Sequence, residues 1–262
     1  MEKQTVVVKV GGSTLPHREA VLADLAELHS AGLEVVIAHG GGAALTDWLA
    51  RVDKQPTFVN GLRVTDDETL ELAVMVFAGA VNKQLVALLN AAGIPAVGIS
   101  GVDGCLVRAR RQTDPDIGLV GQAEQVDTTP LRALLDHGLI PVVACIVLGP
   151  DGQILNINAD TLAGDLARAL HASRVVFLTD VPGVRGADGA VIPTLSAGKT
   201  DRLIADGVIT GGMIPKVEAC LRCLDGVPEA VILDGSVSHV LRDHVLGSAT
   251  AGTVFRSRSL TA

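Results

Sequence analysis

Short apolar runs of strand length alternate with helix-period segments along almost the whole chain. Apolar runs without polar alternation are typical of strands buried on both faces, and helices between them return the chain so that successive strands lie parallel. The pattern therefore predicts an α/β fold, a three-layer αβα sandwich with a mainly parallel central sheet. The expected strands are residues 6–10, 33–38, 94–99, 139–148, 174–179 and 230–234.

Two segments between these strands carry clear helix signals. Leu45, Trp48 and Val52 have helical spacing and are expected to form one apolar stripe. Residues 65–68, Thr-Asp-Asp-Glu, match a capping box, so a long helix is expected to begin there and to end before Gly93.

Three stretches interrupt the alternation and are expected to form β-hairpin lids at the edge of the sheet. No Pro/Ser-rich linker divides the chain, so two lobes would have to share one continuous sheet. We place their boundary between residues 175 and 176. The three stretches are residues 105–126, 149–158 and 185–192.

Composition argues against several classes of partner. Aromatic residues make up 2% of the chain, and the formal net charge is -8. Both features disfavour nucleic acid, which is bound by basic surfaces and stacking rings. The start of the chain has no signal-peptide pattern, no apolar run is expected to span a bilayer, and the four cysteines are scattered. We therefore expect a cytoplasmic protein with reduced thiols and no membrane partner.

Two glycine-containing loops each follow an expected strand. One is residues 9–13 (KVGGS), and the other is residues 39–42 (HGGG), immediately before a helix. Such loops let backbone N–H groups approach an anion, and the helix dipole favours negative charge there. Glycines that merely permit tight turns are the alternative. Two loops, one of them with Lys9 at a strand end, favour a phosphate or carboxylate site.

Polar groups in three later segments indicate a site for an anionic substrate. Asn156, Asn158 and Asp160 alternate at the junction of a hairpin and a helix. Asp160 could be the helix N-cap, whereas the two amides have no such duty and are expected to bind substrate. Lys216 lies in a first helical turn, where a cation opposes the dipole unless it faces a bound polyphosphate. Arg63 is expected to clamp a carboxylate, with a surface salt bridge as the alternative.

Familiar nucleotide and hydrolase motifs do not match. Gly198-Lys199-Thr200 lacks the earlier glycine of a P-loop, and no GxGxxG occurs. A lipase-like hydrolase, suggested by the HGGG segment, requires a GxSxG elbow. Residues 98–102 come closest to that elbow and lack its final glycine, so a hydrolase is the weaker hypothesis.

The motifs taken together resemble acetylglutamate kinase, of the amino acid kinase superfamily. The resemblance extends in order from about residue 5 to about residue 256, and one departure is Ala43, where a proline is common. NGLRVTD together with GGMIPKV is specific for this member of the superfamily. The matching segments are KVGGS (9–13), HGGG (39–42), NGLRVTD (60–66), VNK (81–83), INAD (157–160), TDVPGV (179–184) and GGMIPKVEA (211–219).

The resemblance implies transfer of the γ-phosphate of ATP to the side-chain carboxylate of N-acetyl-L-glutamate, a step of arginine biosynthesis. It implies Mg²⁺ held mainly by the phosphates, with no metal site on the protein itself. No general base is required, because the acceptor carboxylate is already ionised at neutral pH. The lobe of residues 1–175 would bind the amino acid and dimerise, and the lobe of residues 176–262 would bind the nucleotide.

The resemblance also assigns roles to individual residues. Lys9 and Lys216 would stabilise the transition state, and Asp160 would hold the two lysines in place. The acceptor would be bound by Gly41, Gly42, Arg63, Asn156 and Asn158. The nucleotide would be bound by Gly11, Gly12, Thr179, Asp180, Val181, Gly183, Val184, Gly207, Gly211, Gly212 and Met213.

Two other functions are alternatives to this kinase reaction. A kinase for a related acylated amino acid, such as carrier-bound aminoadipate, is disfavoured by residues 60–63 (NGLR). A non-catalytic amino-acid sensor of the same fold is disfavoured because Lys9 and Lys216, which a sensor does not need, are both present.

We expect a homodimer that acts on small-molecule substrates. In the resembled family, arginine-inhibited hexameric rings use an extra N-terminal helix, whereas only residues 1–4 precede the strand-like run of residues 5–10 here. Arginine inhibition is therefore not expected. The candidate interface is an apolar stripe on the long helix, with packing on its own sheet as the alternative. The stripe comprises Leu70, Val74, Phe77, Val81 and Leu85.

Overall fold

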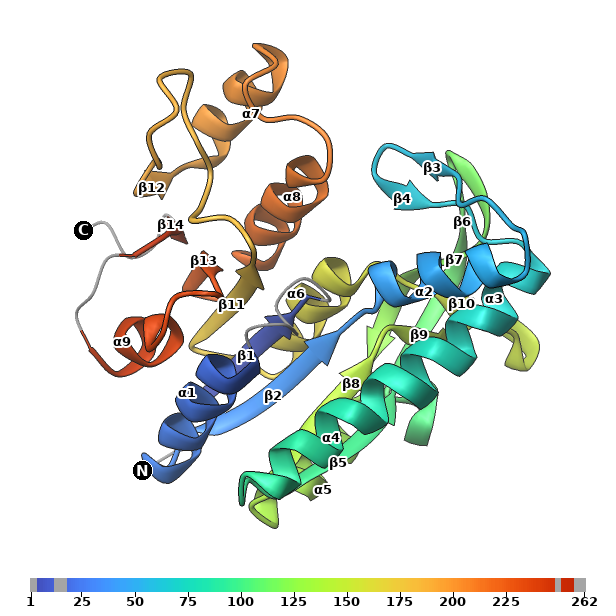
Figure 1. Cartoon of the computed structure of the whole chain (residues 1–262), viewed down its shortest axis with the longest axis horizontal. Coiled ribbons are helices and arrows are strands. Elements are labelled where there is room, and N and C mark those ends of the chain that lie inside the picture. Colours follow the sequence, from blue (N-terminus) through green and yellow to red (C-terminus); the bar gives the residue numbers. More distant parts are fainter. Residues whose placement is uncertain (1–3, 12–17, 248–250, 257–262) are drawn as a thin grey trace.

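A central sheet of eight strands organises the fold (Figure 1). The computed structural model describes residues 4–11, 18–247 and 251–256. Strand order is β12-β14-β13-β11-β1-β2-β8-β5, and every neighbouring pair is parallel except β13 with β14. The predicted mainly parallel sheet is confirmed. Its strands are β1 (Thr5–Val10), β2 (Glu34–His39), β5 (Ala96–Ser100), β8 (Ile140–Ala144), β11 (Arg174–Thr179), β12 (Thr194–Leu195), β13 (Glu229–Asp234) and β14 (Thr253–Arg256).

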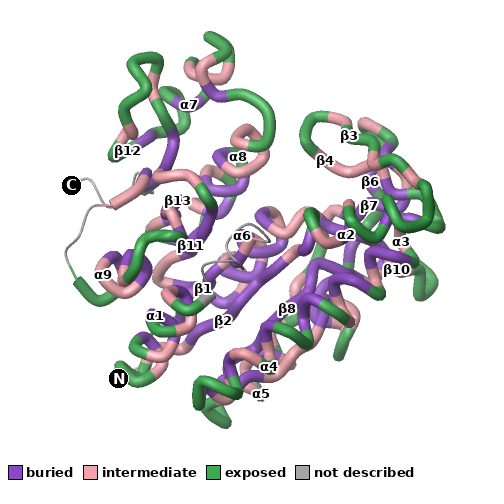
Figure 2. The backbone as a smooth tube through the Cα atoms, in the orientation of Figure 1, coloured by how far each residue is buried: buried purple, intermediate pink, exposed green. Residues whose placement is uncertain are grey.

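Helices cover both faces of this sheet. Val7 and Val8 are consecutive in β1 and point to opposite faces, yet each is 0% exposed. Figure 2 shows the buried backbone in the middle of the molecule and exposed segments around it. The predicted αβα sandwich is therefore confirmed. The helices are α1 (Arg18–Ser30), α2 (Gly42–Arg51), α3 (Asp67–Ala73), α4 (Asn82–Ala91), α5 (Thr129–Asp136), α6 (Ala159–Ala169), α7 (Ala197–Ala205), α8 (Met213–Cys223) and α9 (Val240–Leu246).

A second, smaller sheet is closed on itself and lies beside the central one. The predicted strand at residues 139–148 is divided, because Cys145 separates β8 of the central sheet from β9 of the small one. The hairpin predicted at 105–126 is confirmed as an antiparallel pair, whereas the one predicted at 149–158 begins earlier, because its first strand is residues 146–148. Both hairpins form this closed sheet and are not separate lids. Its strands are β6 (Val107–Thr113), β7 (Asp116–Val126), β9 (Ile146–Leu148) and β10 (Ile154–Asn156).

Two other hairpins differ from the expectation. The stretch 185–192 is reduced to one isolated bridge between Arg185 and Val191. A short hairpin that we did not predict joins β3 (Phe58–Val59) to β4 (Leu62–Arg63). Asn60 (φ 50°) and Gly61 (φ 79°) make its turn, which is the two-residue Asn-Gly turn that suits the strand twist.

The long helix begins one residue later than predicted. Its N-cap is Asp66, whose Oδ1 accepts a hydrogen bond from Thr69 N at 2.9 Å. Thr65 is not the cap: its hydroxyl donates to Arg63 O, and the same oxygen accepts from Asn156 Nδ2 and not from a helix N–H. The helix then continues as α3, a π-helical segment (Val74–Val81) and α4.

This helix corrects two expectations. By length and composition alone, the helical segment Asp67–Ala91 is long and apolar enough to cross a membrane, whereas we expected no apolar run to span a bilayer. Phe77, Val81 and Leu85 are at most 7% exposed and pack in the core of the chain. Buried core helices can be as long and as apolar as a membrane span. Three of the five stripe residues are therefore internal, and Leu70 and Val74 are partly buried against the same core, which favours the alternative of packing within the chain. The outward side carries Met75, which is 54% exposed.

The buried face of α2 also differs from the prediction. Leu45 and Leu49 are buried, whereas Trp48 and Val52 are 41% and 45% exposed. The Arg51 guanidinium lies 4.5 Å from the centre of the exposed Trp48 ring, in a cation–π contact at the surface. The predicted stripe was therefore wrong for two of its three members.

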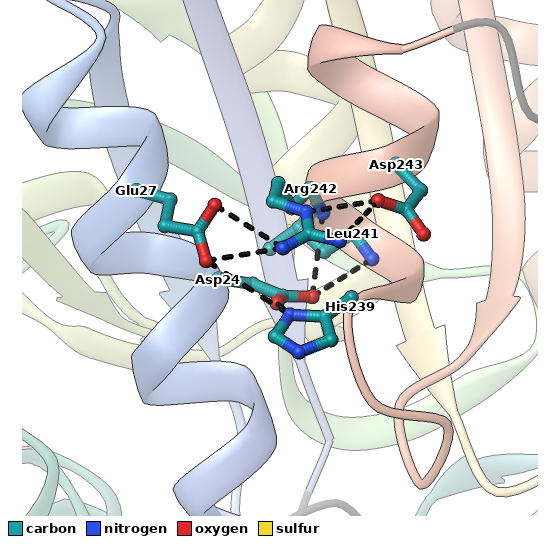
Figure 3. Close-up of polar contacts among 6 residues, drawn as sticks. All are labelled: Asp24, Glu27, His239, Leu241, Arg242 and Asp243. Carbon is teal, nitrogen blue, oxygen red and sulfur yellow. Dashed lines mark hydrogen bonds and ion pairs between the residues drawn. The ribbon is translucent and has the colours of Figure 1, made fainter.

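A buried carboxylate joins α1 to α9 (Figure 3). Asp24 is 1% exposed, and its Oδ2 accepts hydrogen bonds from Leu241 N at 3.0 Å and Arg242 N at 3.3 Å. These N–H groups lie in the first turn of α9, so Asp24 acts as a cap supplied by another helix. His239 Nδ1 lies 3.3 Å from Asp24 Oδ1. Burial raises the pKa of Asp24 despite these hydrogen bonds.

Candidate active site

Asp160 lies between the two lysines that the sequence pattern singled out. Lys9 is near the end of β1, Asp160 is in the first turn of α6, and Lys216 is in the first turn of α8. Lys9 Nζ lies 2.9 Å from Asp160 Oδ1, and Lys216 Nζ lies 2.9 Å from Asp160 Oδ2. The structure therefore brings together three residues that are far apart in the sequence.

The charges of this triad are only slightly exposed to water. The side chains of Lys9, Asp160 and Lys216 are 12%, 9% and 14% exposed. Burial alone would raise the pKa of Asp160, but the two ammonium groups outweigh it and lower the pKa. Two cations and one anion leave a net charge of about +1, and weak solvent screening makes this a favourable place for an anion.

A cavity beside this triad collects the residues predicted to hold the acceptor. We call it the Arg63 cavity; its volume is about 190 Å³. Cys145 also lines it, and burial raises the pKa of that thiol to about 12. All five predicted acceptor residues line the cavity, which brings together Gly41, Gly42, Arg63, Asn156 and Asn158.

Arg63 is held at one edge of the cavity with unused hydrogen-bonding capacity. Its Nη2 donates to Gly42 O at 3.0 Å and to Thr46 Oγ1 at 2.9 Å, and its guanidinium lies 4.7 Å above the Phe58 ring. Its Nη1 is buried and has no hydrogen-bond partner among the described residues. Burial lowers the pKa of Arg63. Since no described carboxylate pairs with it, the surface salt bridge is excluded, and the free Nη1 fits an anionic ligand.

Gly41, in the second glycine-containing loop, is required by packing. A Cβ on Gly41 would lie 2.8 Å from Phe77 Cδ1 and 3.1 Å from Val81 Cγ2. The loop therefore sits directly on the long helix, which lets the N-terminus of α2 face the Arg63 cavity.

The two asparagines have different local duties. Asn158 is the N-cap of α6, and its Oδ1 accepts from Asp160 N and Thr161 N. The expectation that Asn158 had no capping duty, and that Asp160 could be the cap, was wrong. Asn156 is 8% exposed, and its Nδ2 donates to Thr65 Oγ1 at 3.2 Å, whereas its amide oxygen accepts no hydrogen bond from the described residues.

A second cavity lies on the other side of Lys9. We call it the Thr179 cavity; its volume is about 360 Å³. Lys9 and Gly11 line both cavities, and Lys216 lines this one, so the two cavities meet at the lysine triad. Six residues predicted to bind the nucleotide line it, namely Gly11, Thr179, Asp180, Val181, Gly212 and Met213.

The remaining predicted nucleotide residues do not line this cavity in the part of the chain that is described. Gly183 packs against Thr253, and Val184 is buried with its N–H donating to Thr253 Oγ1, so both hold β14 in place. Gly207 follows α7, and Gly211 lines a different cavity. Gly12 lies outside the described residues.

Sequence reasoning missed the aromatic support of the site. Phe58 lines the Arg63 cavity and pairs with Arg63 across the β3–β4 hairpin. The Asn60-Gly61 turn was the available signal, since a two-residue turn places residues 58 and 63 opposite each other. Phe77, which lies under Gly41, gave no comparable local signal.

A buried histidine network behind the loop was also missed. His39 is 1% exposed; its Nδ1 donates to Gly40 O at 2.8 Å, and its Nε2 accepts from Asn82 Nδ2 at 2.9 Å. This tautomer follows from the neighbours, because a carbonyl only accepts and the amide nitrogen only donates. Lys83 Nζ donates to Asn82 Oδ1. Burial, together with the nearby charges of Lys9 and Lys83, lowers the pKa of His39 to about 4, although the hydrogen bond to Gly40 O acts in the opposite direction.

The fold and the lysine triad define the class of protein. The sequence profile described as "Amino acid kinase family" matches residues 4–234. The chain belongs to the amino acid kinase family.

Relatives within this family confirm the resemblance drawn from the motifs. The acetylglutamate kinase of Synechococcus sp. (strain WH7803) is 46% identical over 97% of this chain and 89% of its own length. The acetylglutamate kinase of Gluconobacter oxydans (strain 621H) is also 46% identical, over 97% of this chain and 91% of its own. Among solved structures, the N-acetylglutamate synthase of Neisseria gonorrhoeae, complexed with coenzyme A and N-acetyl-glutamate, has a TM-score of 0.85 at 26% identity. That likeness covers 97% of this chain and 59% of the longer synthase chain.

Proposed function

We propose that this chain transfers the γ-phosphate of ATP to the side-chain carboxylate of N-acetyl-L-glutamate, as a step of arginine biosynthesis. The single observation that carries the proposal is the Lys9–Asp160–Lys216 triad at the meeting point of two cavities. The names of the relatives support the choice of acceptor. A carrier-bound acceptor and a non-catalytic sensor are not favoured by them.

The acceptor would occupy the Arg63 cavity. Its α-carboxylate would take the free Nη1 of Arg63, since a guanidinium binds carboxylate with directed N–H groups. The N-terminus of α2 at Gly41 and Gly42, with the amides of Asn156 and Asn158, would complete the polar contacts. The side-chain carboxylate would then lie near Lys9, which lines both cavities.

The nucleotide would occupy the Thr179 cavity, with its γ-phosphate directed to the triad. Repulsion between an anionic acceptor and a polyphosphate is the main barrier to their approach. One ammonium group about 4 Å from an anion contributes about 4 kcal/mol at an effective dielectric of about 20. Lys9 and Lys216 would thus stabilise the transferring phosphoryl group from two sides, and Asp160 would keep the ammonium groups from separating.

Mg²⁺ would be carried in by the nucleotide. Among the described residues, no group of three or more His, Cys, Asp or Glu side chains is placed to hold a metal. This fits Mg²⁺, which is usually bound by substrate phosphates, water and only one or two carboxylates. Asp180 is the carboxylate of the Thr179 cavity. The ion would supply charge neutralisation at the β- and γ-phosphates.

The proposal extends to organisation and location. Residues 1–175 would bind the acceptor and residues 176–262 the nucleotide, on one continuous sheet. A homodimer would use the outward side of the long helix, where Met75 is exposed. A cytoplasmic location is supported by Cys105, Cys145, Cys220 and Cys223, which are all free thiols.

An ADP-release assay tests the proposed reaction. We expect activity with N-acetyl-L-glutamate and little with glutamate or aspartate. The last two carry an extra ammonium group, which would need a carboxylate partner. Among the described residues of the Arg63 cavity the carboxylate is Asp160, which is already paired with Lys9. Equal or greater activity with aspartate, or none with N-acetyl-L-glutamate in a folded sample, would refute it.

A further inference from the structure

The VNK segment of the sequence (81–83) has no part in the reaction as proposed, yet its asparagine is fully buried. Asn82 is the first residue of α4, which lies beside β5 and β8 (Figure 1). Its Nδ2 donates to His39 Nε2 and to Val142 O, both at 2.9 Å, and to Ile99 O at 3.3 Å. One amide group therefore connects α4 to three neighbouring strands, β2, β8 and β5.

The surroundings of Asn82 fix the orientation of its amide. A Cβ on Gly98 of β5 would clash with Asn82 Oδ1, so only glycine lets the side chain approach this strand. Lys83 Nζ donates to Asn82 Oδ1 and to Gly98 O, each at 3.0 Å. Because an ammonium group only donates, the amide oxygen is directed at Lys83 and the amide nitrogen at His39.

His39 transmits this orientation to the glycine-containing loop. Asn82 donates to Nε2, so the proton of the neutral ring is on Nδ1, which donates to Gly40 O at 2.8 Å. The Gly40–Gly41 peptide bond is trans. In a trans peptide the C=O and the following N–H point in opposite directions, so a carbonyl held by His39 directs Gly41 N–H away from the ring.

The Gly40–Gly41 peptide lies at the end of the Arg63 cavity where the lysine triad is found. Both glycines line this cavity together with Lys9 and Asp160. A Cβ on Gly40 would lie 3.2 Å from the Cβ of Ala159, the residue before Asp160 in the first turn of α6. The loop therefore reaches the place where the side-chain carboxylate of the acceptor would meet the phosphoryl group.

We propose that His39, held by Asn82, is a positioning residue that directs Gly41 N–H at the reacting carboxylate of the acceptor. This inference rests on the proposed acceptor function of the Arg63 cavity. Neither His39 nor Asn82 lines the Arg63 cavity or the Thr179 cavity, so both act through the loop. A backbone donor held in place stabilises charge at the reacting oxygen without reorganising during the reaction, so losing its orientation lowers kcat.

Two replacements of His39 separate positioning from packing. His39→Asn places an amide N–H near the position of Nδ1 and can keep the hydrogen bond to Gly40 O, although it is the smaller side chain. His39→Gln is closer to histidine in size and can keep an acceptor for Asn82, but it loses the donor to Gly40 O. A residue that only fills the core would be replaced better by the larger glutamine. Positioning of the loop predicts the opposite order of kcat.

ADP-release assays of wild type and both variants measure kcat and KM for N-acetylglutamate and ATP. We expect His39→Gln to lower kcat by about 10- to 100-fold and His39→Asn by less than about fivefold, with KM for ATP within about threefold in both. Values of kcat within about twofold of each other in the two variants, the reverse order, or a defect confined to KM for ATP would overturn the inference and leave the proposed function intact. No activity of wild type with N-acetylglutamate, in protein with a native circular-dichroism spectrum, would overturn both.

A pair of asparagines on α4 repeats the test if the His39 variants do not fold. Asn82→Ala removes the donor that fixes the ring and should lower kcat by at least about tenfold. Asn90→Ala is the matched control, because Asn90 binds Ala96 N and O at the start of β5, and its kcat should stay within about threefold of wild type. Equal losses of kcat in this pair would overturn the inference.

Nitrogen-15 NMR tests the same network in the wild-type protein, without a variant. Near neutral pH, the assigned shifts of the His39 ring should show a protonated Nδ1 and an unprotonated Nε2. A protonated Nε2 would leave no donor for Gly40 O and would overturn the inference.

Discussion

Replacement of Lys216 by alanine tests the role of the triad directly. The ammonium group of Lys216 lies 2.9 Å from Asp160 Oδ2 and is 14% exposed, so solvent screens it weakly. A phosphoryl oxygen about 3–4 Å away would gain about 4–5 kcal/mol from it at an effective dielectric of about 20. Only the part of this interaction that grows in the transition state accelerates the reaction, and loss of one such donor typically costs about 2.7–4 kcal/mol.

We therefore expect Lys216→Ala to lower kcat by about 100- to 1,000-fold while KM for both substrates changes by less than about threefold. Initial rates of ADP release, with each substrate varied in turn, measure both quantities. Lys199→Ala is the control, because it removes an equal charge from an exposed position on α7. Thermal unfolding of both variants checks that they are folded and of comparable stability. A kcat within about threefold of wild type, in folded Lys216→Ala protein, would remove Lys216 from the mechanism.

Three further predictions concern binding, stability and pH. Arg63→Lys keeps the charge but loses the fork that contacts Gly42 O, so KM for N-acetylglutamate should rise about 10- to 100-fold with little change for ATP; a selective ATP defect would place Arg63 in the nucleotide half. Asp24→Ala removes the acceptor of two N–H groups of α9 and should lower the free energy of unfolding by about 1–3 kcal/mol in urea titrations, whereas an unchanged value would show that this cap is dispensable. His39 has a pKa of about 4 in the folded protein against 6.5 ordinarily, so the unfolded chain binds more protons between these values and stability falls as pH drops through this window. This group should make the protein about 2 kcal/mol less stable at pH 5 than at pH 7, and His39→Gln should abolish that part of the difference; an unchanged pH dependence in the variant would contradict the assignment.

Local patterns in the sequence were sufficient to predict the parallel middle of the central sheet, but not its strands β12 and β14. Burial on both faces imposes continuous apolar runs, and these runs located β1, β2, β5, β11 and β13 to within two residues at each end. The residues with unusual local chemistry were also visible, because a glycine loop after a strand and a lysine in a first helical turn are anomalies that a short window reveals.

Tertiary structure decided the duties that depend on distant partners. Asn158 caps α6 because the chain enters that helix from β10. Trp48 is outside the core because α2 buries Leu45 and Leu49 instead. The run at 139–148 became two strands because its second part pairs with β10 in the closed sheet. In each case the outcome depends on packing against residues far along the chain, which a short sequence window does not contain.

The candidate active site also depends partly on the sequence alone and partly on the tertiary structure. The sequence determined which chemical groups are available, namely two lysines, a carboxylate, an arginine and glycine loops. Only the fold decided that Asp160 is shared between Lys9 and Lys216, that Arg63 keeps a buried Nη1 free, and that two cavities meet at the triad. The physical reason is that a parallel sheet gathers the ends of its strands at one edge, whatever their separation along the chain, and no local pattern records which of those ends become neighbours.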